Sequence, residues 1–308
     1  MTLMSKLRIG VRANRLALAL ADEVVDALRG AHPNLEVELV KVAGSGDHVH
    51  DGPPSGPAFT RDLDAALTQG RVDAALHDLP DLPLVRLDAF ALAAVPRRRH
   101  PFEVFLTRDG RILDELDERE RVAGSTALRR SLMLAYREDL RVVAAKGSLE
   151  THWKQLEDGQ FEGLVMAATD AERLGWHDRV SEIFTTEVCI PTPGQGALGL
   201  EALASRKDVL AALKALDDPD SHRAVVAERA WLNELGGGDD LPAGALARIE
   251  NNHLVMEAVV VSPDGLEIVR DEVEGPATQA ETLGVKLAVR MLERGAREIV
   301  EAVPGEHA

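Results

Sequence analysis

The chain has 308 residues, of which 45% are hydrophobic and 28% are charged, and its formal net charge is −17. The composition predicts a globular protein with a proper core, whereas the negative charge argues against non-specific binding to nucleic acid or to anionic membranes. The single cysteine, Cys189, excludes an intrachain disulfide and an all-cysteine metal site. The first residues lack the apolar core of a signal peptide, and no apolar run of about 18 residues indicates a membrane span. We therefore expect a cytoplasmic protein of two or three domains.

The first part of the chain predicts a β-α-β unit, which favours a parallel sheet. Strands are expected at 7–11 and 35–42, with a helix at 16–29 between them. The helix presents one apolar face, formed by Leu16, Leu20, Val24 and Leu28. The turn between the first strand and this helix consists of Arg12, Ala13 and Asn14.

A loop rich in Gly and Pro follows at 44–57 and has no periodicity. A loop of this length inside a compact domain is usually functional or disordered. Its potential metal ligands are Asp47, His48, His50 and Asp51. Closely spaced loop residues of this kind are more often solvated than metal-bound, so no metal site is expected.

The stretch from Val72 to Pro83 combines a short buried strand with a polar turn, and a helix at 59–69 precedes it. The turn carries an imidazole and two carboxylates, on His77, Asp78 and Asp81, and two prolines stiffen it. Because α/β folds bind ligands beyond the carboxyl ends of strands, such carboxylates can hold or deprotonate a cationic or N–H-bearing group. The alternative interpretation is a capped turn with solvated aspartates.

After this turn the chain continues as alternating strands and helices. Further strands are expected at 87–95, 102–107, 140–144 and 164–168. The segment 96–101 (PRRRHP) predicts a hinge, and its three arginines are expected to form a solvated link.

Gly-Ser-Thr precedes one apolar helix, and Ser125 with Thr126 is typical of an N-cap. The N–H groups at such a helix start can bind an anion. Arg129 and Arg130 would add guanidinium groups that fork onto a carboxylate or phosphate. An ordinary capped helix with surface arginines is the alternative.

The next two strands also end at polar residues. Lys146 and Ser148 follow one strand, while Asp170 and Arg173 follow the other. Strand-to-helix turns thus repeatedly carry a cation, a hydroxyl or a carboxylate. This repetition predicts a polar cleft between two similar α/β lobes.

The last third of the chain indicates a different architecture. The Gly/Pro-rich connection 191–199 leads to a helix expected from Gly199 onward, and 217–220 marks a boundary before a helix at 222–235. Antiparallel strands are then expected at 245–250, 254–261 and 265–273, with turns at 251–252 and 263–265. A final helix at 277–294 completes a small α+β domain.

Three segments are the most specific in the chain: AGSTALRRS, PTPGQGALGLE and AVVAERAWLNELGGG. With these segments, nearly the whole sequence resembles the hydroxymethylbilane synthase family, also called porphobilinogen deaminase. The resemblance implies an α/β fold of two periplasmic-binding-protein-like lobes plus a small C-terminal α+β domain. The implied domains are 1–96 with 197–214, then 101–190, and finally 219–308.

By the same resemblance, the family joins four porphobilinogen units head to tail and releases ammonia, which makes it a transferase. A dipyrromethane primer, thioether-linked to a cysteine, holds the growing chain. Asp81 matches the catalytic aspartate, which assists the pyrrole nitrogens and the deamination. The positions that match substrate-binding residues are Arg12, Asn14, Ser125, Thr126, Arg129, Arg130, Lys146, Ser148, His152 and Arg173.

Several positions depart from the family pattern. Asp239, followed by Asp240, stands where the family has its attachment cysteine, and Cys189 lies in another segment. Where the family has arginine, asparagine and arginine, this chain has Lys146, Ser148 and His152, and family lysines fall at Pro80 and Gly56. Each charged hydrogen bond lost should weaken binding of a polycarboxylate by about 1–3 kcal/mol.

These departures lead to the hypothesis of a divergent enzyme that acts on a pyrrole or amino-carboxylate substrate without dipyrromethane-primed tetramerisation. Asp81, Asp78 and His77 would supply its acid–base groups. No covalently bound cofactor is expected, and dipyrromethane only if it is held without the usual thioether. The expected partner is a small carboxylated, pyrrole-like ligand, with neither nucleic acid nor membrane, and the expected state is a monomer. Two alternatives remain: a non-catalytic two-lobed protein that binds a carboxylated ligand, and an active hydroxymethylbilane synthase with a differently held primer.

Overall fold

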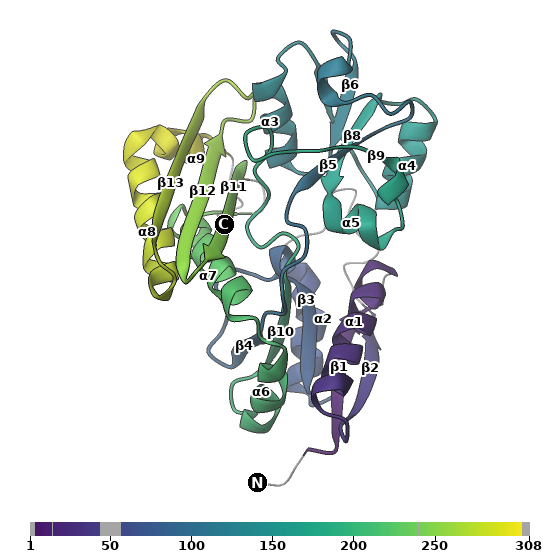
Figure 1. The fold of residues 1–308 in the computed structure, drawn as a ribbon, viewed down its shortest axis with the longest axis vertical. Helices are drawn as coiled ribbons and strands as arrows, with labels where there is room; N and C mark the ends of the chain where they lie inside the picture. Colours follow the sequence, from purple (N-terminus) through teal and green to yellow (C-terminus); the bar gives the residue numbers. More distant parts are fainter. Residues whose placement is uncertain (1–3, 14, 44–56, 239–240, 304–308) are drawn as a thin grey trace. The chain divides into compact units, whose positions relative to one another are not determined.

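The computed structural model describes residues 4–13, 15–43, 57–238 and 241–303. Within these residues the chain forms two compact units (Figure 1). Of the described residues, unit 1 contains 4–13, 15–43, 57–99 and 196–222, and unit 2 contains 100–195, 223–238 and 241–303. The predictions for Asn14, for Asp239 and for the ligands in the 44–56 loop lie outside the described residues.

Unit 1 is built on one five-stranded mixed sheet. Its main elements are β1 (Lys6–Arg12), α1 (Arg15–Ala31), β2 (Glu36–Val42), α2 (Pro57–Thr68), β3 (Ala74–Asp78), β4 (Phe90–Ala94), β10 (Leu198–Leu203) and α6 (Lys207–Leu213). The strand order is β2-β1-β3-β10-β4. β1 is parallel to β2 and β3, which confirms the predicted parallel β-α-β opening, and β10 is antiparallel to both of its neighbours.

The apolar pattern of the sequence decides which helix covers which face of this sheet. Leu20, Val24 and Leu28 of α1 are buried against β1, as their spacing predicts, and α6 packs in the same cluster. α2 places Leu63 and Leu67 in a separate cluster with Ala75 of β3. Successive side chains of a strand point to opposite faces, so each residue of β3 and β10 faces either α1 and α6 or α2.

The helix predicted from Gly199 onward is wrong, because residues 198–203 form strand β10. Leu198 and Leu200 belong to the cluster under α1 and α6, whereas Glu201 is buried on the other face. A strand buried on both faces has no alternation of polar and apolar residues, so periodicity cannot separate it from a buried helix. The helix of this region, α6, starts only at Lys207.

The first part of unit 2 is a second five-stranded mixed sheet. Its elements are β5 (Glu103–Thr107), β6 (Arg121–Gly124), α3 (Ala127–Tyr136), β7 (Arg141–Ala144), α4 (Leu149–Glu157), β8 (Gly163–Ala167), α5 (Ala168–Arg173) and β9 (Val180–Ile183). The order is β7-β6-β8-β5-β9, with β6 parallel to β7 and β8, and β5 antiparallel to β8 and β9. The expected strands of this region are present, while β9 was not predicted.

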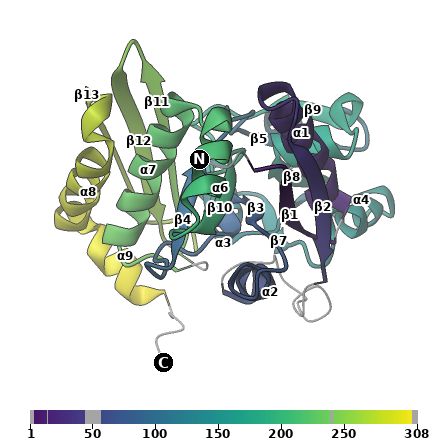
Figure 2. The ribbon, with the colours of Figure 1, turned by 90° about the horizontal axis from the view of Figure 1, so that it is seen from below.

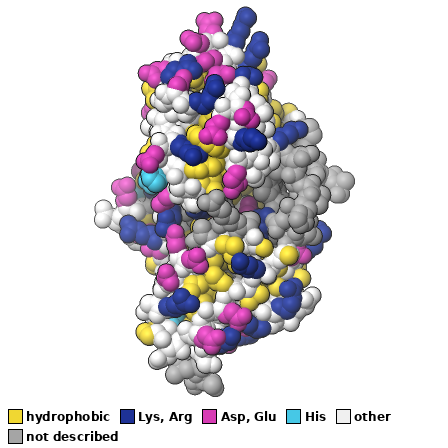
Figure 3. All heavy atoms as spheres, turned by 90° about the vertical axis from the view of Figure 1, so that its right-hand side faces the viewer, with side chains coloured by type: hydrophobic (Ala, Val, Ile, Leu, Met, Phe, Trp, Pro, Cys, Tyr) yellow, Lys and Arg dark blue, Asp and Glu magenta, His cyan; other side chains and the backbone are white. Residues whose placement is uncertain are grey.

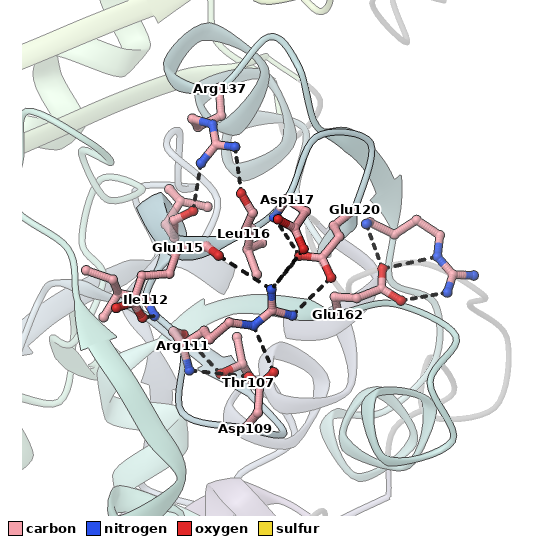
Figure 4. Close-up of polar contacts among 12 residues, drawn as sticks. Thr107, Asp109, Arg111, Ile112, Glu115, Leu116, Asp117, Glu120, Arg137 and Glu162 are labelled. Atoms are coloured by element: carbon pink, nitrogen blue, oxygen red, sulfur yellow. Dashed lines mark hydrogen bonds and ion pairs between the residues drawn. The ribbon is translucent and has the colours of Figure 1, made fainter.

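Two arginines fix the connection between β5 and β6 (Figure 4). Arg111 donates to both carboxylate oxygens of Glu120, at 2.9 and 3.0 Å, and to Asp109 at 2.8 Å. Arg137, at the end of α3, donates to two backbone carbonyl oxygens of the same connection. These guanidinium groups hold a surface loop in place, and we assign them no ligand.

The C-terminal part of unit 2 is a three-stranded antiparallel sheet with helices on one face (Figures 1 and 2). It comprises α7 (Pro219–Glu234), β11 (Ala243–Glu250), β12 (His253–Val261), β13 (Ile268–Pro276), α8 (Ala280–Met291) and α9 (Arg297–Ala302). Trp231 of α7 and Leu287 of α8 share its core. The opposite face contributes Val259 and Val261 to the cluster that contains Leu132 of α3.

The predicted turns of this sheet are confirmed, and the helix expected at 277–294 corresponds to a 3-10 turn (Ala277–Gln279), α8 and the helical residues that follow it. Asn251 and Asn252 both have positive φ, 51° and 62°, which suits a tight hairpin and favours Asn over branched residues. Gly295 has a φ of 111° and interrupts the helical stretch after α8. A residue without a Cβ adopts this conformation at little cost, so the chain bends there before α9.

The predicted fold class, two α/β lobes with a small C-terminal α+β part, is confirmed. The finer division into three domains stays a prediction, because the contacts place the second sheet and the C-terminal sheet in one unit. Among the described residues, no helix combines the length and the apolar character that a membrane span requires. On the face shown in Figure 3, basic and acidic side chains are interspersed.

Candidate functional site

In unit 1, two predicted site residues meet where neighbouring parallel strands end. Arg12 is the last residue of β1, and Asp81 closes the short 3-10 turn (Leu79–Asp81) that follows β3. Arg12 Nη1 lies 3.4 Å from Asp81 Oδ2, and the side chains are 15% and 28% exposed. The carboxylate is therefore paired with a cation and still accessible to a ligand.

The turn that carries Asp81 is anchored at its first residue. Leu79 is fully buried, and its backbone N–H donates to the carbonyl oxygen of Ala197 at 3.0 Å. Its side chain lies over Gly199, where a Cβ would come within 2.9 Å of Leu79 Cδ2. Leu82 then closes the turn by donating to the carbonyl oxygen of Leu79. The prolines and these contacts place the carboxylate on a stiff support.

His77, a predicted acid–base partner of Asp81, belongs to the strand and not to the turn that carries Asp81. β3 continues to Asp78, so His77 lies inside the strand, buried on the face that α2 covers. Its Nε2 lies 3.6 Å from Glu201 Oε2 on the neighbouring strand. Asp78 is half-buried at the strand end and makes no side-chain capping hydrogen bond.

In unit 2, the predicted N-cap at the end of β6 is present. The Thr126 hydroxyl accepts a hydrogen bond from the backbone N–H of Arg129 at 3.2 Å, at the start of α3. Ser125 Oγ accepts from Arg129 Nη1 at 2.9 Å. Both hydroxyls therefore order the helix start and the arginine that follows it.

Arg129 is a buried residue with a buried partner. Its Nε donates to Glu103 Oε1 at 2.9 Å, and Nη2 donates to Gln195 Oε1 at 3.3 Å. Burial opposes the charge of the guanidinium, but the carboxylate of Glu103 outweighs it and raises the pKa of Arg129. The alternative of an ordinary helix with surface arginines thus does not apply to this residue, which is charged inside the protein.

Arg130 lies beside it but is only half-buried. Its Nη1 donates to the backbone carbonyl oxygens of Gly124 and Ser125, both at 3.2 Å. These bonds orient the guanidinium at the junction of β6 and α3. A cation there reinforces the positive end of the helix dipole, so the position favours an anionic ligand.

The turn after β7 contributes three residues with different surroundings. Lys146 is exposed, and Ser148 caps α4 by accepting from the backbone N–H of Thr151 at 3.3 Å. His152 is only 3% exposed, and burial together with the nearby Arg129 lowers its pKa to about 4. Its Nε2 has no hydrogen-bond partner among the described residues. The imidazole is therefore neutral at pH 7.

Arg173 lies at the end of α5, after β8. Its side chain is 4% exposed, and Nη1 lies 3.3 Å from Asp170 Oδ1. Asp170 also raises the pKa of Arg129, so the carboxylate acts on two guanidinium groups. The ends of three parallel strands, β6, β7 and β8, thus carry the cationic and hydroxyl side chains of unit 2.

Four residues that contact the predicted site residues or their neighbours were not singled out from the sequence: Arg86, Glu103, Gln195 and Glu201. Each forms contacts with residues far away in the chain, such as Glu103 with Arg129 and Arg86 with Glu201. The sequence did hold a signal for two of them, because Glu103 in EVFLT and Glu201 in LGLEAL each lie within an apolar run. A charged side chain buried in such a run requires a partner of opposite charge. Among the described residues, no group of three or more His, Cys, Asp and Glu side chains could hold a metal ion.

Comparison with known proteins identifies the family to which the sequence belongs. Residues 7–211 match the model "Porphobilinogen deaminase, dipyromethane cofactor binding domain", and 222–293 match "Porphobilinogen deaminase, C-terminal domain". A porphobilinogen deaminase of Desulforudis audaxviator is 40% identical over 300 residues, covering 96% of this chain and 97% of the relative. The chain belongs to the porphobilinogen deaminase family.

Other relatives of this family are similar over the same span. The porphobilinogen deaminases of Brevibacillus brevis and Roseiflexus sp. are 34% and 38% identical, and cover 99% and 95% of this chain and 99% and 97% of the relatives. The methionine-binding protein MetQ, by structure, has a TM-score of 0.44 at 15% sequence identity, covering 73% of this chain and 95% of that protein. This structural similarity is too low to bear on function.

Membership of the porphobilinogen deaminase family corrects the functional hypothesis. A divergent enzyme without primed tetramerisation is contradicted by relatives of this name at 34–40% identity over nearly the full length. Of the alternatives, the findings favour hydroxymethylbilane synthase. The hypothesis gave a few substituted positions too much weight, although Arg12, Arg129, Arg130 and Arg173 are retained.

The expectation about the cofactor is wrong as well. No covalently bound cofactor was expected, but the match over residues 7–211 is to a dipyrromethane cofactor-binding domain. That expectation was drawn from one position, Asp239, which lies outside the described residues. The match extends over both α/β sheets, far beyond the one position from which the expectation was drawn.

Proposed function

We propose that the chain is an active porphobilinogen deaminase, a transferase that joins porphobilinogen units and releases ammonia. The observation that carries this proposal is the pairing of Arg12 with Asp81 on an anchored turn, in a chain of this family. Porphobilinogen loses an amino group from a methylene carbon, and that carbon then bonds to a pyrrole ring carbon. Positive charge develops on the pyrrole as ammonia leaves.

Asp81 is suited to this step because its carboxylate is accessible and fixed. Arg12 pairs with it at 3.4 Å, and a carboxylate can accept a hydrogen bond from a pyrrole N–H. The negative charge of a carboxylate stabilises the cation that develops in the reaction. In this proposal Asp81 is the catalytic residue, and Arg12 orients its carboxylate.

The donors of unit 2 fit a dipyrromethane that bears acetate and propionate groups. When bound, dipyrromethane supplies the pyrrole carbon to which the first substrate unit is joined. Arg130 and Arg173 can pair with carboxylates, and the His152 Nε2, buried and without a described partner, can donate a hydrogen bond if it carries the proton. We assign carboxylate binding to these residues, together with Ser125, Thr126, Lys146 and Ser148.

The way in which the primer is held is the finer part of the proposal. Cys189 is the only thiol of the chain; it is 0% exposed, and burial raises its pKa well above the usual range. A buried thiol of this kind is not a nucleophile. We infer that Cys189 is not the attachment point of the dipyrromethane, and that the ionic contacts of unit 2 help to hold it.

The test measures activity and attachment on the same sample. Purified chain is incubated with porphobilinogen, and the release of ammonia and the formation of hydroxymethylbilane are followed. We expect both, together with a colour reaction of the native protein with Ehrlich's reagent. Intact mass then shows whether the primer remains on the denatured chain, and peptide mapping locates any bond.

Asp239→Cys is the matched variant, because it restores the family's thiol without changing the rest of the site. We expect it to acquire a mass increase that survives denaturation and to stay active. If Asp239→Cys released ammonia from porphobilinogen while the natural chain released none, the proposed activity would be wrong. A thioether on Cys189 in the natural chain would contradict the finer part alone.

A further inference from the structure

The carboxylate of Glu201 contacts residues on both sides of Asp81 in the sequence. Glu201 lies on β10, and its side chain is 1% exposed. On one side, His77 Nε2 lies 3.6 Å from Glu201 Oε2; on the other, Arg86 Nε donates to Glu201 Oε1 at 2.8 Å. The segment 77–86, which contains Asp81, is therefore attached at both ends to one buried group.

Arg86 also connects this carboxylate to helix α2. Its Nη1 and Nη2 donate to the two carboxylate oxygens of Asp64, at 3.0 and 2.7 Å. Its guanidinium carbon lies 4.6 Å from the centroid of the Phe90 ring, at the start of β4. Burial opposes the charge, but Asp64 and Glu201 together raise the pKa of Arg86. A planar group with two bidentate partners and a ring beneath it has little freedom to move.

The position of Arg86 in the chain gives these contacts a consequence for the site. The residue follows Asp81 by one short loop, whose Leu82 is buried and whose Val85 side chain is exposed. An exposed apolar side chain contributes little to hold the loop on the sheet. Arg86, by contrast, ties the chain between Leu82 and β4 to two carboxylates.

We propose that Arg86, by bridging Glu201 and Asp64, is a positioning residue that keeps the carboxylate of Asp81 against Arg12. This inference rests on the proposed function for its effect on catalysis, but the geometry it describes is independent of that function. A displacement of about 1 Å at a reacting group can lower the rate by a factor of about 100. Loss of the tether should therefore reduce kcat, whereas KM should change little, because the guanidinium of Arg86 is engaged by Asp64 and Glu201.

The experiment must separate positioning from stability, because Arg86→Met alone leaves the buried Glu201 without its cation. Such an unpaired buried charge is strongly destabilising. Arg86→Met/Glu201→Gln removes the charge as well, so its Tm should return toward that of the natural chain. If Arg86 positions Asp81, kcat of this double variant stays about 10- to 100-fold low. If kcat recovers together with Tm, the ion pair is only structural and the inference is wrong.

Two further variants sharpen the comparison. Arg86→Lys keeps a charge but not the fork, and we expect its kcat to lie between those of the natural chain and of Arg86→Met. Arg8→Met is the control in the same unit: Arg8 pairs with the buried Asp73, which keeps a second partner in Arg206. We expect no change in kcat for this control.

A readout independent of activity distinguishes failure of this inference from failure of the proposed function. The backbone N–H of Leu79 and that of Leu82 are hydrogen-bonded within the Asp81 turn and its anchor. In the double variant their hydrogen exchange should become about 10-fold faster relative to the Arg8→Met control. Unchanged exchange in the double variant would overturn the inference, even if the natural chain proved inactive.

Discussion

The Arg12 guanidinium and the Asp81 carboxylate lie 3.4 Å apart although 69 positions separate them in the sequence. The pairing follows from the sheet: β1 and β3 are parallel neighbours, so the residues beyond their carboxyl ends meet at one edge. The arrangement brings a fixed anion and its cation to the place where an α/β fold can hold a ligand. Its consequences can be measured.

Asp81→Asn should abolish most of the ammonia release from porphobilinogen. The amide keeps the shape of the side chain but loses the charge that stabilises a cation, and we expect kcat to fall by at least about 100-fold. Because Asp81 is partly exposed, Tm should change little. Asp178→Asn, at a highly exposed carboxylate that contacts His177, is the control. Equal activity of Asp81→Asn and this control would contradict the assignment.

Arg130→Met and Arg129→Met should differ in what they damage. Arg130 is half-buried, and its loss should weaken binding of a carboxylated ligand by about 1.5–3 kcal/mol for the charged hydrogen bond removed. Arg129→Met instead leaves Glu103 buried without its cation, which should cost about 3–5 kcal/mol of stability. Denaturant unfolding and a KM measurement on both variants check the contrast. A similar stability loss in both would show that Arg130 is also structural.

Cys189→Ala should leave the activity and any bound primer unchanged. The thiol is buried in the apolar core with Phe105 and Leu132, so it cannot serve as the attachment point. Intact mass and Ehrlich's reagent should give the same result for variant and natural chain, and a thiol reagent should react only after unfolding. Loss of a bound pyrrole in the variant would identify Cys189 as the anchor after all.

Gly199→Ala should lower kcat through Leu79. The new Cβ would lie 2.9 Å from Leu79 Cδ2 and 3.0 Å from Leu92 Cδ1, so the residue that anchors the Asp81 turn must move. We expect a stability loss of about 1–3 kcal/mol and reduced ammonia release. In Gly30→Ala, the control in α1, a Cβ meets nothing within 4 Å, and activity should be retained. Full activity of Gly199→Ala would mean that Leu79 can move without displacing Asp81.

His152 should make stability depend on pH. Its pKa falls from 6.5 to about 4 on folding, so the unfolded chain binds a proton first as the pH is lowered. The stabilisation by the neutral imidazole is complete above pH 6.5 and is lost as the pH falls through about 4, a loss of about 3 kcal/mol. His152→Gln has no such group, so its unfolding free energy should fall less between pH 7 and 4. Parallel curves for the two proteins would contradict a neutral buried His152.

The sequence predicted the elements better than their contacts. The apolar face of α1 and the N-cap at Thr126 follow from local spacing, so they could be anticipated. β10 could not, because Leu198–Leu203 is buried on both faces and has no strand periodicity. The end of β3 was also placed too early. The strand continues to Asp78, so His77 is a strand residue whose side chain lies on the same face of the sheet as Glu201.

The candidate site was predictable where it consists of side chains that follow strands, and not where it depends on buried partners. Arg129 and Asp81 stand out because of their motifs. Glu103 and Arg86 do not, because their roles arise from ion pairs with residues 26 and 115 positions away. Only the folded chain shows that Arg129 is enclosed by a carboxylate and an amide.

The location of β10 between β3 and β4 bears on how the protein is made. A ribosome completes the first four strands of unit 1 long before it reaches Leu198, and it synthesises the second sheet in between. Until then the nascent chain leaves an edge of β3 and an edge of β4 open to intermolecular pairing. Fragments that end before Leu198 should therefore aggregate.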